Sequence, residues 1–290
     1  ISKGMSVADI ESEMQEIYGI NLSTSAISII TNKVSQAATE WQNRPLESLY
    51  MIVWMDGIVF KVRENGKVIN KTVYLCVGLN KEGLKEVLGM WIGKNESAAF
   101  WMGVLTDLKA RGVEDILITV TDNLNGFTET IKSVFPASTT QICVVHQIRN
   151  SCRYVVWKEK KEFTADLKNI YNAPTKEAAE MELDNFEQKW GAKYPYAIRS
   201  WRNNWEELTV FFDFPVEIRK IIYTTNLIEN LNGKIRKYTK NKLSFPNDDA
   251  LKKSVYLAIN EIEKKWYQPI WNWALIFNQF ITIFENRIQV

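Results

Sequence analysis

Cysteine, histidine and long apolar runs are all scarce in this 290-residue sequence. Three cysteines, an odd and small number, are too few for a disulfide framework and indicate a reducing compartment. No run of 18 or more apolar residues occurs, so we expect no membrane span and a cytoplasmic location. The one histidine, His146, together with Cys143 and Cys152, falls short of the four ligands of a structural zinc site.

An excess of charge is also lacking, because the formal net charge is only +2. Any nucleic-acid surface must therefore come from local clustering of basic residues. Residues 219–242 form such a cluster, with seven Lys or Arg against one acid, Glu229. Neutralising phosphates is the simplest use of these charges, and a solvated helix face is the alternative.

The sequence begins I-S-K-G-M-S, without an initiator Met or a signal-peptide pattern, and we expect a fragment that starts inside an element. Residues 1–44 read as two helices, with a stop at Tyr18-Gly19 and a cap at Ser23 or Thr24. This pattern suits a partial helix-turn-helix with residues 25–33 as recognition helix. An ordinary helical hairpin fits it equally well.

Residues 45–146 change to a strand pattern that is interrupted by two helices. Three strands joined by short turns come first, and then a helix, a strand, a helix and a strand. This is the order of an RNase H-like mixed five-stranded sheet, an α/β fold. We expect strands at 49–62, 68–79, 84–92, 115–121 and 139–145, and helices at 97–111 and 126–135.

From residue 147 to 220 the strand signal vanishes, which predicts an all-α insertion domain. Residues 221–290 then complete the core with helices at 225–239, 248–265 and 271–287. The predicted insertion is rich in tryptophan, which can pack in a core or stack on unpaired bases. The tryptophans concerned are Trp157, Trp190, Trp201 and Trp205.

Two acids stand where this fold can use them for chemistry. Asp56 interrupts a hydrophobic strand, and Asp122 follows a buried one. Because the first and fourth strands of an RNase H-like sheet are neighbours, the two carboxylates can share Mg²⁺ or Mn²⁺. Asp56 could instead pair with Lys61 or Arg63, and Asp122 could cap the next helix.

Glu229 is the best candidate for a third acid. It is the only acid between residues 222 and 242, and it heads a basic segment. The spacing Asn226-x-x-Glu229 also suits an N-cap with a capping-box acid, so a purely structural role is open. A capping role would still hold Glu229 in the first turn of its helix.

Four blocks of the sequence resemble motifs of the Mutator-type bacterial insertion-sequence transposases. They are M-D-G-I (55–58), T-D-N-L-N-G-F (121–127), C-V-V-H-Q-I-R-N (143–150) and Y-T-T-N-L-I-E-N-L-N (223–232). The resemblance implies a DDE transposase, with catalytic and metal-binding acids at Asp56, Asp122 and Glu229 and two Mg²⁺ or Mn²⁺ ions. It implies an auxiliary C-x-x-H element at Cys143 and His146, where the alternative for His146 is a core role.

The implied partners are double-stranded DNA, as terminal inverted repeats and as target, and a second copy on the DNA. The implied location is a bacterial nucleoid. Two other readings stay open: an inactive or domesticated DNA-binding remnant, and an RNase H-like nuclease acting on RNA hybrids. The candidate DNA contacts are Arg149, Arg153, Arg199, Arg202, Lys234, Arg236, Lys237 and Lys240.

Overall fold

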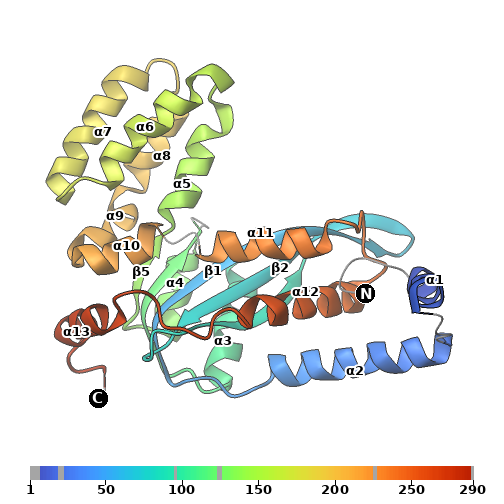
Figure 1. The fold of residues 1–290 in the computed structure, drawn as a ribbon. Coiled ribbons are helices and arrows are strands. Elements are labelled where there is room, and N and C mark those ends of the chain that lie inside the picture. Colours follow the sequence, from blue (N-terminus) through green and yellow to red (C-terminus); the bar gives the residue numbers. More distant parts are fainter. Residues whose placement is uncertain (1–6, 19–22, 95–96, 123–125, 225–226, 289–290) are drawn as a thin grey trace.

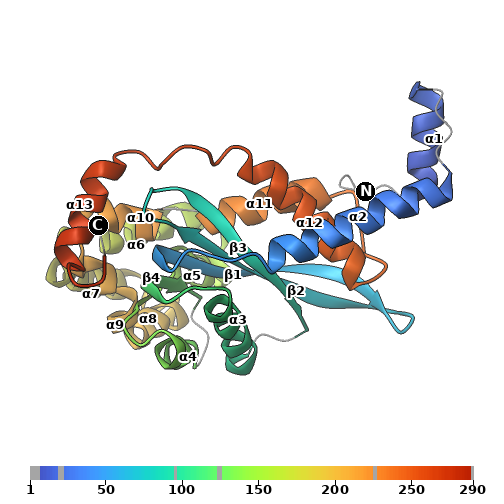
Figure 2. The ribbon, with the colours of Figure 1, turned by 90° about the horizontal axis from the view of Figure 1, so that it is seen from below.

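The protein is described by a computed structural model over residues 7–18, 23–94, 97–122, 126–224 and 227–288 (Figure 1). Three sequence-based expectations lie outside these residues: the helix stop at Gly19, the loop at 123–125 and the helix cap at Asn226. Within the described residues, a mixed sheet forms the centre of the molecule, and helices cover both of its faces (Figures 1 and 2).

The sheet has five strands in the order β3-β2-β1-β4-β5. Strand β2 pairs antiparallel with β1 and β3, whereas β4 pairs parallel with β1 and β5. The predicted mixed sheet, with its first and fourth strands adjacent, is therefore confirmed. The strands are β1 (Leu49–Glu64), β2 (Lys67–Leu79), β3 (Lys85–Gly93), β4 (Asp115–Thr121) and β5 (Thr139–Ile142).

Strand β1 is buried on both faces, which explains its nearly continuous apolar sequence. Val53 and Met55 pack toward α3 (Ala98–Ala110) and α4 (Phe127–Val134). Trp54 points the other way and joins the core beneath the C-terminal helices. That second face is covered by α2 (Thr24–Gln42), α11 (Leu227–Thr239) and α12 (Asp248–Glu263).

A group of helices follows β5 and stands beyond one end of the sheet (Figure 1). Within the continuous segment 126–224, no strand occurs after Ile142, as the sequence predicted. The helices are α5 (Val144–Ser151), α6 (Lys160–Tyr171), α7 (Lys176–Trp190), α8 (Pro195–Asn203), α9 (Trp205–Leu208) and α10 (Val216–Thr224). Short 3₁₀ turns are η1 (Cys152–Tyr154), η2 (Trp157–Glu159) and η3 (Val210–Asp213).

The fifth strand is shorter than predicted. We expected it to reach residue 145, but β5 ends at Ile142 and α5 begins at Val144. Val144 and Gln147 are buried three residues apart, which is a helical spacing and not the alternation of a strand. His146 therefore lies on a helix and not at the end of a strand.

Three of the four tryptophans considered above are core residues. Trp190, Trp201 and Trp205 are buried. The indole N–H of Trp201 donates to the Ser151 hydroxyl at 2.9 Å, and that of Trp190 donates to Asp166 at 2.8 Å. The packing interpretation is confirmed for these three, whereas Trp157 is exposed.

The N-terminal helices are α1 (Val7–Tyr18) and α2. The Ser23 hydroxyl caps α2 by accepting from the Ala26 N–H, as one of the two predicted caps. Helix α2 extends well beyond the candidate recognition helix at 25–33 and packs on α12, with Ser35 donating to Asp249 at 3.0 Å. The helix-turn-helix remains a prediction.

The chain ends with α13 (Trp273–Ile283), beside α10 and the end of the sheet (Figure 1). Its predicted extent, 271–287, was too long at both ends. Among the described residues, no helix combines the length and the apolar character needed to cross a membrane.

Candidate active site

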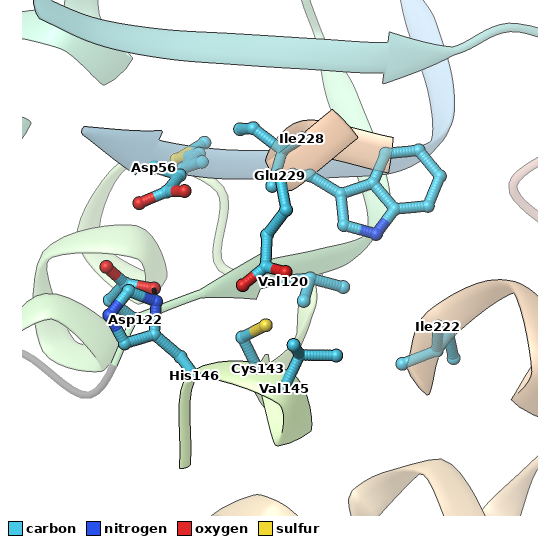
Figure 3. Close-up of a pocket in the computed structure, with 11 residues that line it drawn as sticks. Asp56, Val120, Asp122, Cys143, Val145, His146, Ile222, Ile228 and Glu229 are labelled. Carbon is cyan, nitrogen blue, oxygen red and sulfur yellow. Dashed lines mark ion pairs between the residues drawn. The ribbon is translucent and has the colours of Figure 1, made fainter. Parts of the chain in front are cut away.

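The topology of the sheet brings Asp56 and Asp122 together. In the parallel ladder between β1 and β4, Trp54 lies opposite Val120. Asp56 and Asp122 each follow two residues later, so both carboxylates emerge at the same height. Side chains two residues apart share a face of a strand, so Asp56 points to the same face as Trp54, under α11. Figure 3 shows both acids facing one pocket.

Asp56 is almost fully buried, with 6% of its surface exposed. One carboxylate oxygen accepts from the Gly57 backbone N–H at 2.7 Å, and the other accepts from the Asn232 amide at 2.8 Å. The predicted alternative, pairing with Lys61 or Arg63, is not what holds this carboxylate. Burial, reinforced by the negative charge of Asp122, raises the pKa of Asp56 to about 7.

Asp122 is held by His146, the chain's one histidine. The ring Nδ1 of His146 lies 2.6 Å from the Asp122 carboxylate. This hydrogen bond is the main cause that raises the pKa of His146 above its ordinary value. The alternative role of Asp122 as the N-cap of α4 is not seen, because the N-cap residue of that helix is Gly126.

Glu229 reaches the same pocket from the first turn of α11 (Figure 3). Its carboxylate forms an ion pair with Arg149 of α5 at 2.5 Å. Asn232 lies one turn further along α11, on the same face, and binds Asp56. Helix α11 therefore supplies both a third acid and a hydrogen-bond donor to the first acid.

The donor atoms at this pocket suit a hard divalent cation. Asp56, Asp122 and His146 each offer one atom, and these atoms all lie within 4.8 Å of one another. Carboxylate oxygens, which Asp56 and Asp122 offer, are typical ligands of Mg²⁺ and Mn²⁺. Glu229 is outside this group of three, since it is turned to Arg149. The predicted trio of acids thus lines one pocket, with two members already in contact range of a single ion.

Cys143 lines the pocket without joining the donor group. Its burial raises the pKa of the thiol to about 12. Cys143 and His146 alone are fewer than the four ligands of a structural zinc site, which argues against such a site here. The predicted auxiliary pair lies together, but the contact to an acid is made by His146.

Two residues of the site were not predicted from the sequence. Asn232 follows Glu229 by three residues, a helical spacing that could have suggested a shared face. Trp54 precedes Asp56 by two residues and lines the pocket, with its indole N–H buried and unpaired among the described residues. Apolar walls complete the pocket at Ile222 and Ile228 (Figure 3).

The candidate DNA contacts divide into two groups. Lys234, Arg236 and Lys237 project from α11, the helix that carries Glu229, and Lys240 follows directly after its end. Lys234, Lys237 and Lys240 line a surface groove between α11 and α12, together with Tyr238 and Lys265.

The candidates outside α11 are in more varied surroundings. The guanidinium of Arg202 is already bound by Asp184 and Glu187, and that of Arg149 is bound by Glu229. Arg199 lines a shallow surface pocket beside Arg202. Arg153 is exposed near the end of α5. A DNA role for each of these stays a prediction.

The whole chain can be compared with known proteins. Residues 1–269 match the family described as transposase, Mutator family, and the chain belongs to that family. It is 44% identical over 287 residues to a probable transposase for an ISRM3-like insertion sequence element of Sinorhizobium fredii, covering 99% of this chain and 72% of the relative. A probable transposase of Corynebacterium diphtheriae is 40% identical over 90% of this chain and 77% of its own length.

The chain also resembles more distant proteins. The transposase for IS905 of Lactococcus lactis is 32% identical over 92% of this chain and 68% of its own length. Among solved structures, the Drosophila P element transposase strand transfer complex shows 10% identity over 90% of this chain and 79% of that chain, with a TM-score of 0.31. That score is too low to support conclusions about this chain.

Proposed function

We propose that this protein is a DDE transposase, which cleaves DNA strands and joins them to a target with the help of divalent metal ions. The observation that carries the proposal is the convergence of Asp56 and Asp122 on one pocket that Glu229 also lines. Membership of the Mutator family supplies the context of an insertion sequence. An inactive remnant has less support, because all three acids are intact.

The three acids would hold the metal ions. Bound Mg²⁺ would activate a water molecule or the 3′-hydroxyl of a DNA strand as nucleophile, and would stabilise the leaving oxygen of a phosphodiester. Burial, reinforced by the charge of Asp122, raises the pKa of Asp56, and a cation between the two carboxylates would relieve their repulsion. Glu229 would become the third carboxylate ligand by leaving its ion pair with Arg149 and binding the metal.

Two further residues would keep the acids in position. His146 binds Asp122 through Nδ1 and thereby fixes the orientation of that carboxylate. Asn232 binds Asp56 in the same way from α11. The buried walls at Trp54, Ile222 and Ile228 would restrict water around the reacting groups.

Double-stranded DNA is the proposed substrate, as the ends of the element and as the target. The lysines and Arg236 along α11 would neutralise phosphates close to Glu229. Two ends must be held together for transposition, so a dimer on DNA is part of the proposal.

The test is strand cleavage on a plasmid that carries this gene with its natural flanking sequences. We expect Mg²⁺- or Mn²⁺-dependent nicking at the element ends, lost by at least about a hundredfold in Asp122→Asn because one metal ligand is weakened. Lys176→Ala, far from the acids in a surface ion pair with Glu206, is the matched control. Cleavage that Asp122→Asn leaves unchanged would refute the assigned site. Preference for RNA–DNA hybrid over duplex would favour the nuclease reading.

A further inference from the structure

Trp157 is exposed in a region where the other tryptophans considered are core residues. It lies in η2, between α5 and α6, with 86% of its surface exposed. Tyr154 and Val156 beside it are also exposed, at 63% and 52%. Large apolar side chains gathered on a surface mark a site of interaction more often than chance exposure does.

The charges around Trp157 are positive and uncompensated. Arg153, Lys158, Lys160 and Lys161 surround it in sequence, and none of them forms an ion pair with a described residue. The one acid among them, Glu159, is neutralised by an ion pair with Lys193 and also accepts from the Tyr194 hydroxyl. The surface therefore offers, next to an exposed indole, four cations that no carboxylate of the described residues neutralises in an ion pair.

This surface is continuous with the active site. The first turn of α5 places His146 beside Asp122, and Arg149 of the same helix binds Glu229. Arg149, Arg153 and Lys160 then line one surface hollow at the far end of the helix. In Figure 1, α5 leads away from the end of the sheet. A strand whose phosphate lies at the acids can follow the same row of cations.

We propose that Arg153, Tyr154, Trp157 and Lys160 form a binding surface for single-stranded DNA, with Trp157 stacking on an unpaired base. The inference rests on DNA being the substrate, as proposed above. Basic grooves with exposed aromatic rings are the usual means of binding unpaired strands, because every base presents a flat face. Tyr154 is held for such a contact by an edge-on ring packing with Tyr196 at 5.6 Å and by Arg153 over its ring.

A second copy of the chain fits this surface less well. A two-fold interface would bring the patch against itself, and the four cations would then face their own equivalents. Duplex DNA would satisfy the cations but would leave the indole without a base to stack on, since its bases are paired and stacked. The charge and the exposed ring together favour an unpaired strand.

The test compares two DNAs in a buffer with EDTA: a blunt duplex, and the same duplex with a single-stranded tail that contains 2-aminopurine. We expect the wild-type protein to prefer the tailed DNA and to quench the 2-aminopurine. Trp157→Ala should lower affinity for the tailed DNA by on the order of tenfold and abolish quenching, while leaving blunt-duplex binding unchanged. Trp157→Phe should retain most of the preference.

Trp271→Ala is the matched control, since Trp271 is 85% exposed and lies outside this surface. An unchanged ratio of tailed to blunt affinity in Trp157→Ala would overturn the inference. So would a Trp157→Ala protein that loses self-association while keeping its DNA preference. Because the assay uses no divalent ion, it separates this inference from the proposed catalysis: lost cleavage with retained tail preference would contradict the catalysis alone.

Discussion

At the scale of single residues, the catalytic role proposed for Asp56 opposes the stability of the folded protein. Its carboxylate is buried next to Asp122, and its pKa is raised from 3.8 to about 7. Burial of an ionised carboxylate without a paired cation is costly. Two hydrogen bonds, from Gly57 and Asn232, offset part of this cost but leave the pKa high.

This pKa predicts a pH-dependent stability in the absence of divalent ions. Between about pH 4 and pH 7 the folded state binds a proton at Asp56 that the unfolded state has lost, so the free energy of unfolding falls as pH rises. Asp56→Asn removes this loss and should be the more stable protein at pH 8, by up to about 4 kcal/mol. The difference should vanish near pH 4.

Urea unfolding in EDTA at several pH values measures this difference. Adding Mn²⁺ at pH 8 should stabilise the wild type and leave Asp56→Asn nearly unchanged, because the cation takes the place of the proton. A variant less stable than wild type at pH 8 in EDTA would show that Asp56 is not a strained carboxylate.

At the scale of elements, the sequence predicted the strands better than the helix that follows them. The ends of β1, β2 and β4 were placed within two residues, because the Asn65-Gly66 turn and the apolar runs mark them clearly. The fifth strand was drawn too long, since Cys143, Val144 and Val145 read equally well as strand or buried helix. The start of α5 has no side-chain cap that could have marked it.

The part of the site that depends only on the order of the strands was predictable from the sequence. The parallel pairing of β1 with β4 followed from the order of elements, and it places Asp56 beside Asp122. The ion pair of Arg149 with Glu229 and the bond of Asn232 to Asp56 join α5 and α11 to the site across long sequence separations. No local pattern specifies such contacts. Whether a tryptophan in a charged helical stretch is core, like Trp201, or exposed, like Trp157, depends equally on the packed structure.

The contact between α5 and α11 gives a prediction at this scale. The Glu229 carboxylate is held in an ion pair by Arg149. A metal ion that binds Glu229 must therefore displace the Arg149 guanidinium. Arg149→Gln should therefore raise the affinity for Mn²⁺ severalfold, whereas the loss of a half-exposed ion pair should cost at most about 1 kcal/mol of stability. Titration of Mn²⁺ followed by electron paramagnetic resonance measures the affinity. A lower affinity in Arg149→Gln would mean that Glu229 is not recruited to the metal.

At the scale of the whole molecule, basic surfaces stand out against a net charge of only +2. One runs along α11 next to the acids, and the other surrounds Trp157 at the far end of α5. Elsewhere many cations are paired, as Arg202 is with Asp184 and Glu187. If DNA is the substrate, as proposed, these two surfaces are where its phosphates would bind.

The salt dependence of DNA binding tests that distribution. Lys237 projects from α11, and no ion pair occupies it among the described residues. Lys237→Ala should weaken binding to blunt duplex without regard to sequence and reduce the slope of log K against log salt by about one. Lys176→Ala, which removes a lysine already paired with Glu206, should leave the slope unchanged. Equal slopes for both variants and the wild type would show that Lys237 of α11 does not contact DNA phosphates.

Anomalous scattering from crystals soaked in Mn²⁺ would test directly whether the three acids converge on metal. We expect Mn²⁺ bound between the carboxylates of Asp56 and Asp122 at about 2.1 Å, with Glu229 turned away from Arg149 toward the metal. Mn²⁺ held elsewhere, or by His146 and Cys143 without the acids, would contradict it.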